Sequence, residues 1–249
     1  MLGMRCATAS VGREEAVERK TMNTVWDNGA LRIRVERKGR IMLAPPDVGT
    51  PLVLVPAGPL CEVVLAAAGI PFSAVRSPLE DPPGLIGRVN AVEAAEALAY
   101  YRARSVADRQ HCRRVLGIST LVRVGDHVFG PPPGRLEAAA MLHAVSGREH
   151  SVVTGVALLD GTRRLLAADV TSVAMRPIPG REIDRYLASG GWLGIAGAYA
   201  TPEMAERFVA RRDGSFSNLL GVPVELVLNM LAEIGEHPNA HRTPALASA

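Results

Sequence analysis

The sequence predicts an α/β fold built on a mixed β-sheet, and three observations lead to this prediction. Short runs rich in Val and Leu alternate with segments of helical periodicity. The dipeptide Asp160-Gly161 between two such runs is a strong hairpin signal, so some neighbouring strands are antiparallel. With 48% hydrophobic residues among 249, the chain can bury a substantial core. One α/β domain is therefore expected to hold most of the chain.

An N-terminal extension, residues 1–50, is predicted to precede this domain. It is rich in charges and contains two hairpin signals and one breaker run, at Asp27-Asn28-Gly29, Lys38-Gly39 and Ala44-Pro45-Pro46-Asp47. We place the α/β domain at residues 51–236, and we expect the tail 237–249 to be disordered.

Within the domain, each element is assigned from its own pattern. Short apolar or β-branched runs predict strands, and segments closed by glycine or opened by proline predict helices. The expected strands are 52–55, 114–122, 126–129, 151–159 and 164–175, and the expected helices are 62–68, 92–109, 136–145, 181–188 and 223–235. Repeated prolines between residues 51 and 75 argue against a membrane span there.

Composition excludes several functional classes. The 28 basic and 25 acidic residues give a net charge of only +3, and the basic residues are dispersed among the acids. With an aromatic content of 4%, a surface for stacking nucleic-acid bases is not expected. Three widely spaced cysteines, Cys6, Cys61 and Cys112, fit neither a zinc site nor a disulfide scaffold, and they favour a reducing cytoplasm.

Generic catalytic motifs are not found. The glycine-rich segment 190–197 does not match a dinucleotide fingerprint, and no P-loop sequence is present. Ser119 lacks the second glycine of a nucleophile elbow, and no histidine pair has metal-binding helix spacing. Short motifs therefore indicate only an α/β domain.

Six longer segments, read together, carry a resemblance to one known family. The segment 146–156, Ser-Gly-Arg-Glu-His-Ser-Val-Val-Thr-Gly-Val, resembles the central signature of the Maf family, the septum-formation-type nucleoside triphosphate pyrophosphatases. Five further matches follow the family's order, at residues 68–72, 96–103, 137–142, 196–199 and 217–223. The resemblance covers about residues 52–235 and implies a single domain with a mixed, elongated sheet flanked by helices.

The same resemblance implies a reaction and a site. The family cleaves a nucleoside triphosphate to a monophosphate and diphosphate with a divalent metal, Mg²⁺ or Mn²⁺, and a homodimer is expected. Glu80 and Asp81 fall where the family has an acidic pair and are the candidate metal ligands. The candidate substrate-binding residues are Arg102, Thr120, Arg148 and Thr154.

The chain departs from the family pattern at its ionic positions. Ser119 stands where the family has the carboxylate regarded as catalytic, and a hydroxyl cannot replace a base near neutral pH. The segment 56–61 lacks the two arginines of the family's opening loop, and uncharged residues replace two lysines and a glutamate at Pro131, Ile195 and Ser172. The glycines, prolines and apolar residues that set the backbone geometry match the family pattern, whereas the charged residues of the site do not. We therefore expect weak or no pyrophosphatase activity.

Two other functions remain open. The chain could be a non-catalytic pseudoenzyme whose cleft binds a nucleotide or a protein, with residues 1–50 covering it. It could also be an unrelated enzyme that uses Ser119, His150 or Cys112 as nucleophile or base.

Overall fold

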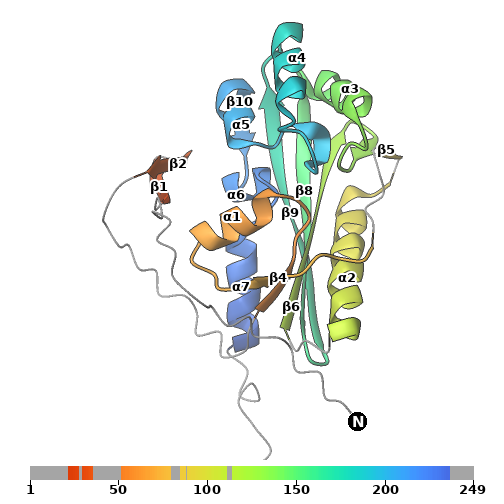
Figure 1. Cartoon of the computed structure of the whole chain (residues 1–249), viewed down its shortest axis with the longest axis vertical. Helices are drawn as coiled ribbons and strands as arrows, with labels where there is room; N and C mark the ends of the chain where they lie inside the picture. Colours follow the sequence, from red (N-terminus) through yellow and green to blue (C-terminus); the bar gives the residue numbers. More distant parts are fainter. Residues whose placement is uncertain are drawn as a thin grey trace, which may run out of the picture.

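The computed structural model describes residues 22–27, 30–35, 52–79, 85–87, 89–110 and 114–235. Within this part, eight strands form one mixed sheet with the order β10-β9-β8-β6-β3-β4, and β7 joins β6 to β5. Helices lie against both faces of the sheet (Figure 1). The predicted α/β class with a mixed sheet is confirmed.

Three long strands form the antiparallel centre of the sheet: β6 (Arg114–Val124), β8 (Glu149–Asp160) and β9 (Arg163–Met175). Asp160 pairs with Arg163, so residues 161 and 162 form the turn, and Gly161 adopts a left-handed φ of 61°. The hairpin expected from Asp160-Gly161 is confirmed. The remaining strands are β3 (Leu52–Val55), β4 (Ser73–Ala74), β5 (Leu85–Gly87), β7 (His127–Phe129) and β10 (Val209–Asp213).

The helices divide unequally between the two faces. The long helix α2 (Ala91–Gln110) covers one face. On the other face, one apolar cluster joins the sheet to α1 (Leu60–Ala67) and α7 (Val224–Gly235), and a second joins it to α3 (Arg135–Val145) and α4 (Gly180–Ser189). The second cluster also includes residues of η1 (Ala196–Ala198), α5 (Pro202–Phe208) and α6 (Phe216–Leu219). Figure 1 shows α2 and α7 on opposite sides of the sheet.

Two glycines allow α2 to approach the central strands closely. An ideal Cβ on Gly155 of β8 would lie 2.2 Å from the carbonyl carbon of Ala95, and one on Gly117 of β6 would lie 2.3 Å from the carbonyl oxygen of Ala99. Both contacts involve helix backbone, which cannot rotate away as a side chain can. The position of α2 therefore depends on these two residues having no side chain.

The expected elements appear with their ends shifted by at most two residues, but several short elements were missed. The strands β4, β5 and β10 and the helices α5, α6 and η1 were not predicted. Each has seven residues or fewer, which is too short to show a helical or alternating period. The pairing of β10 with the end of β9 depends on contacts between distant segments.

In the N-terminal extension, β1 (Met22–Asp27) pairs antiparallel with β2 (Ala30–Val35). The turn expected at Asp27-Asn28-Gly29 lies between these strands, but residues 28 and 29 are outside the described residues, so this hairpin stays a prediction. The hairpin expected at Lys38-Gly39 and the tail 237–249 lie outside the described residues.

A buried hydrogen bond ties η1 to the start of β8. The Nδ1 atom of His150 lies 3.4 Å from the carbonyl oxygen of Arg148, which can only accept, so Nδ1 carries the proton. The Nε2 atom then accepts from the Tyr199 hydroxyl at 2.6 Å. Burial lowers the pKa of His150 to about 4 and raises the pKa of Tyr199. Both side chains are therefore neutral near pH 7, and this hydrogen bond fixes the chain that follows η1.

The approach of α2 gives a first prediction. Replacing Gly155 with Ala is expected to lower the free energy of unfolding by about 3 kcal/mol, because the new methyl group meets helix backbone. Denaturant unfolding measures this change. The matched control is Gly180→Ala at the start of α4, where an added Cβ meets nothing within 4 Å. Equal stability of the two variants would contradict the proposed role of Gly155.

The neutral His150 gives a second prediction. Its pKa is depressed in the folded protein, so between pH 6.5 and about 4 the unfolded chain binds a proton that the folded protein does not. The contribution of neutral His150 to the free energy of unfolding is fully present above pH 6.5. As the pH falls to 4, the free energy of unfolding decreases by about 3 kcal/mol. Urea unfolding at several pH values should show this loss in the natural protein and not in His150→Gln.

The control for this experiment is His143→Gln, which removes an exposed imidazole from α3. This variant should keep the full dependence of stability on pH. If His150→Gln keeps it as well, His150 is not the group responsible.

Candidate functional site

A cleft opens beside β6, at the point where its neighbouring strand ends. The parallel strand β3 pairs with β6 only from Arg114 to Gly117, and β7 pairs with it again from Val122. Residues 118–121 of β6 therefore have no strand on this side within the described part of the chain. A cleft beyond the carboxyl end of a parallel strand is a common ligand site in α/β proteins.

Two loops narrow this cleft. One follows β3 and includes Gly58 and Pro59, and the other leads into η1 and includes Gly194. An ideal Cβ on Gly58 would lie 2.7 Å from the carbonyl oxygen of Gly194, and one on Gly194 would lie 3.4 Å from Cδ of Pro59. The loops are thus in contact, and the cavity beside them has a volume of about 40 Å³. That volume holds about three water molecules.

The described lining is largely apolar. It consists of small or hydrophobic side chains with two hydroxyls and one charged group, which are Ser119, Thr120 and Arg102. The predicted residues Arg102, Ser119 and Thr120 therefore converge on one cleft, as required of residues that share a site. Pro131 and Ile195, which replace family lysines, also line it.

Arg102 enters the cleft from α2. It is 6% exposed, and its Nη1 donates a hydrogen bond of 2.9 Å to the carbonyl oxygen of Pro56. The guanidinium thus holds the loop after β3 as well as lining the cleft. Burial lowers its pKa from the ordinary value. Burial also raises the pKa of the adjacent Cys61 thiol, which stays protonated near neutral pH.

Thr120 connects the cleft to two other elements. Its hydroxyl donates a hydrogen bond of 3.1 Å to the carbonyl oxygen of Gly221. A hydroxyl has only one hydrogen to donate, so in the bond of 3.1 Å between the Thr120 and Thr154 hydroxyls the donor is Thr154. Gly221 has a left-handed φ of 86°. Thr154 is fully buried behind Thr120 and does not line the cleft.

The other predicted site residues lie elsewhere. Arg148 is exposed next to the start of β8, and its backbone bonds to Val145 and Met175 hold the signature turn. Ser172 lines a separate open hollow of about 380 Å³ on the α2 side of the sheet, where the ion pair between Arg211 and Glu149 spans 2.7 Å. Glu80 and Asp81 lie outside the described residues.

Divalent metal ions do not fit the described lining of the cleft. Mg²⁺ and Mn²⁺ prefer carboxylate oxygens, and none is present among these lining residues. Throughout the described part of the chain, no three His, Cys, Asp or Glu side chains form a group that could hold a metal. None of the described lining residues is therefore assigned as a metal ligand.

Sequence analysis missed one wall of the cleft. The segment 190–197 was tested as a nucleotide-binding fingerprint, and residues 195–199 were matched to a family segment, but the sequence did not show that Gly194, Ile195 and Ala196 form one wall of the cleft. The closely spaced glycines of this segment were a usable signal for a turn, because glycine readily adopts a positive φ. Gly194 and Gly197 have φ values of 70° and 66°. A turn of this kind was readable from the sequence, but its place opposite Gly58 was not.

No helix in the described ranges is long and apolar enough to cross a membrane.

Comparison with known proteins identifies the family. The family model described as Maf-like protein matches residues 51–234.

The relatives include three named dTTP/UTP pyrophosphatase. The protein from Ruminiclostridium cellulolyticum is 33% identical over 187 residues, which cover 74% of this chain and 96% of the relative. The proteins from Cupriavidus metallidurans and Geobacter sulfurreducens are each 36% identical, over 74% of this chain and 92% and 96% of their own lengths. The ordered segments that resemble the Maf signature, the cleft where β3 ends and these matches lead to one conclusion: this chain belongs to the Maf family.

Proposed function

We propose that this protein is a catalytically degenerate member of the nucleoside triphosphate pyrophosphatases, with weak or no hydrolysis of nucleoside triphosphates to monophosphates and diphosphate. The relatives named dTTP/UTP pyrophosphatase support the reaction class and a uracil or thymine nucleotide as the first substrate to test. The observation that carries the proposed loss of activity is the described part of the cleft lining, in which Arg102 is the single charged side chain and Ser119 stands at the family's carboxylate position.

The reaction requires groups that the described lining lacks. A base must orient and deprotonate the attacking water, and a serine hydroxyl does not accept a proton near pH 7. Several positive charges must neutralise a triphosphate, but Pro131 and Ile195 contribute none. Loss of one general base costs a factor of roughly 10² to 10⁴ in rate. Simultaneous loss of several groups supports activity far below that of the relatives.

The size of the cleft supports the same proposal. Ligand pockets generally enclose about 300–1,000 Å³, far more than the cavity of about 40 Å³ beside Ser119. The contact between the Gly58 and Gly194 loops keeps the space beside Ser119 small. The hydrogen bond from Arg102 to Pro56 opposes movement of the first loop.

Any residual hydrolysis is proposed to depend on Mg²⁺ or Mn²⁺ held by Glu80 and Asp81, the acidic pair that the family resemblance indicates. We also propose a reducing compartment, the cytoplasm, for this protein. The free thiol of Cys61 and the wide spacing of the three cysteines support it.

A second candidate function is a non-catalytic binding module. The apolar walls of the cleft, with Leu98, Leu121 and Leu220, favour it because they suit a ligand with less charge than a triphosphate. Calorimetric titration separates the two functions. Tight binding of a magnesium–nucleotide complex by the folded protein would count against this second function.

Diphosphate release tests the main proposal directly. With dTTP, UTP and the other nucleoside triphosphates, in Mg²⁺ or Mn²⁺, we expect rates at least about a hundredfold below those of the Cupriavidus metallidurans relative. A rate within tenfold of that relative would show that the cleft is competent as it stands.

Restoring the carboxylate provides the matched variant. Ser119→Asp is expected to raise diphosphate release at least about tenfold, because it returns a base and anion to the cleft. The control is Ser73→Asp on the exposed strand β4, which adds the same charge elsewhere and should leave the rate unchanged. Equal rates for the two variants would show that Ser119 is not the residue that limits activity.

A further inference from the structure

A polar hollow of about 380 Å³ lies on the face of the sheet that carries α2, separate from the cleft. The helix begins at Ala91, which packs in one apolar cluster with Leu121 and Val153. The next row of side chains on this face holds Arg123 and Ser151, two residues further along β6 and two residues earlier on β8. Since the helix stops before this row, the hollow is open above it.

One row of four residues crosses the hollow from β6 to β10. Each residue pairs with the next across neighbouring strands, and all four line the hollow. In order, they are Arg123, Ser151, Ser172 and Asp213. The row therefore has a positive charge at one end, a negative charge at the other and two hydroxyls between them.

These four side chains have no hydrogen-bond or ion-pair partner within the described part of the chain. Glu149 and Arg211, which also line the hollow, pair with each other at 2.7 Å. They therefore leave the charges of Arg123 and Asp213 without counter-ions. Ser151 is only 7% exposed, and a buried hydroxyl without a hydrogen bond is costly. A ligand with a polar group above Ser151 removes that cost.

The spacing of the two charges determines the length of a suitable ligand. Adjacent strands lie about 4.8 Å apart, so the Cα atoms of Arg123 and Asp213 are separated by about 14 Å. Side chains stand roughly perpendicular to a sheet, so the charged ends keep about this separation. Two ionic hydrogen bonds of about 2.8 Å leave about 8 Å between the charges of the ligand. An extended dipeptide spans about 7 Å, and a single amino acid spans about half of that.

We propose that this hollow binds a zwitterion of dipeptide length, with its carboxylate on Arg123 and its ammonium group on Asp213. The peptide group of the ligand then lies above Ser151 and Ser172. One hydroxyl donates to its carbonyl oxygen, and the other accepts from its N–H group. The site is separate from the cleft that holds Ser119, so the proposal does not depend on the proposed loss of hydrolysis.

The balance of charge in the hollow favours a zwitterion over a simple anion. The arginines Arg123 and Arg211 are matched by two carboxylates, Glu149 and Asp213. An anion attracted by Arg123 also meets the negative charge of these carboxylates, whereas a zwitterion places an opposite charge at each end of the row. Exposed ion pairs are individually weak, so the dissociation constant is expected to be on the order of 1 mM.

Nuclear magnetic resonance titration of the full-length chain with L-alanyl-L-alanine tests the proposal. Saturable shifts are expected at the backbone amides of the lining residues, with a dissociation constant on the order of 1 mM. The N-acetylated dipeptide and the dipeptide amide each lack one charge and should bind at least about fivefold more weakly. Alanine is too short and tetra-alanine too long for the row, and both should bind as weakly as the blocked dipeptides.

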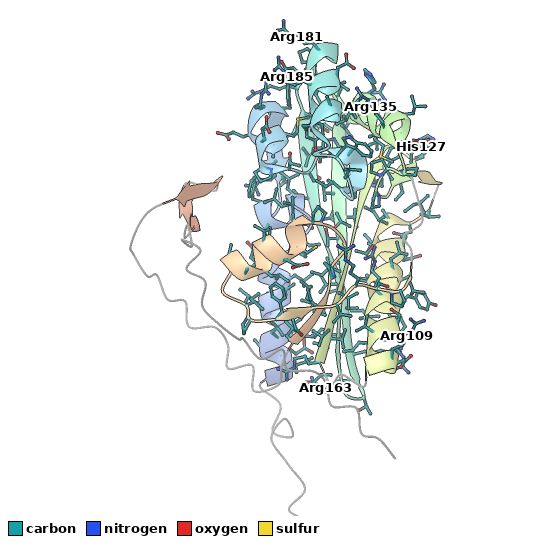
Figure 2. The ribbon with its side chains drawn as sticks, viewed as in Figure 1. Arg109, His127, Arg135, Arg163, Arg181 and Arg185 are labelled. Carbon is teal, nitrogen blue, oxygen red and sulfur yellow. The ribbon has the colours of Figure 1, made fainter. Side chains whose placement is uncertain are left out.

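Variants of the two charged ends make the test specific. Arg123→Gln and Asp213→Asn should each raise the dissociation constant of the dipeptide at least about fivefold. The double variant R123D/D213R exchanges the two ends, so the dipeptide binds in reverse and the natural value should return within about threefold. The matched control is Arg181→Gln on α4, at one tip of the molecule (Figure 2), which should leave the dissociation constant unchanged. Circular dichroism shows whether each variant is folded.

Three results would overturn the proposal. If the dipeptide gives no saturable shifts up to about 20 mM, the hollow is not a site of this kind. Equal binding of the N-acetylated dipeptide shows an anion site that does not use Asp213. A folded double variant that does not recover binding shows that the ligand does not lie along the row from Arg123 to Asp213.

Discussion

The close approach of α2 to the central sheet is the constraint on which the rest of this structure depends. Gly117 and Gly155 leave no room for a side chain between the helix backbone and the two central strands. This contact positions Arg102 beneath the loop that follows β3, where it bonds to the Pro56 carbonyl. Two residues with no side chain therefore determine where Arg102, the one described charge of the cleft, lies. Through Arg102 they also determine the position of the loop after β3 that forms one rim.

Under the proposed function, the cleft keeps the family's fold while its chemistry changes. Backbone geometry here depends on glycines, on Thr120 bonded to Gly221, and on the hydrogen bond between His150 and Tyr199, none of which needs a charged substrate. Catalysis of phosphate transfer depends instead on charges projecting into the cavity. Since the two sets of residues barely overlap, Ser119 could replace a carboxylate without loss of the fold.

Much of the architecture could be predicted because it is local. The β6, β8 and β9 strands are long runs of β-branched and apolar residues, and a glycine marks the turn between β8 and β9, so their existence follows from short-range preferences. The short β10 and η1 have no such period, and they form because distant segments lie beside them. For the cleft, resemblance in sequence located Arg102, Ser119 and Thr120, but it did not show that the Gly58 and Gly194 loops meet.

The sequence by itself determined the fold class, the long elements and the identity of the groups available for chemistry, because periodicity, turn residues and side-chain charge belong to the chain. Only the tertiary structure decided which of these groups meet. Arg148 and Thr154 share one signature segment, yet the first is exposed and the second is buried behind Thr120. Gly58 and Gly194 are distant in sequence and touch across the cleft. Such contacts arise from packing whole elements against one sheet, a long-range property that no local pattern encodes.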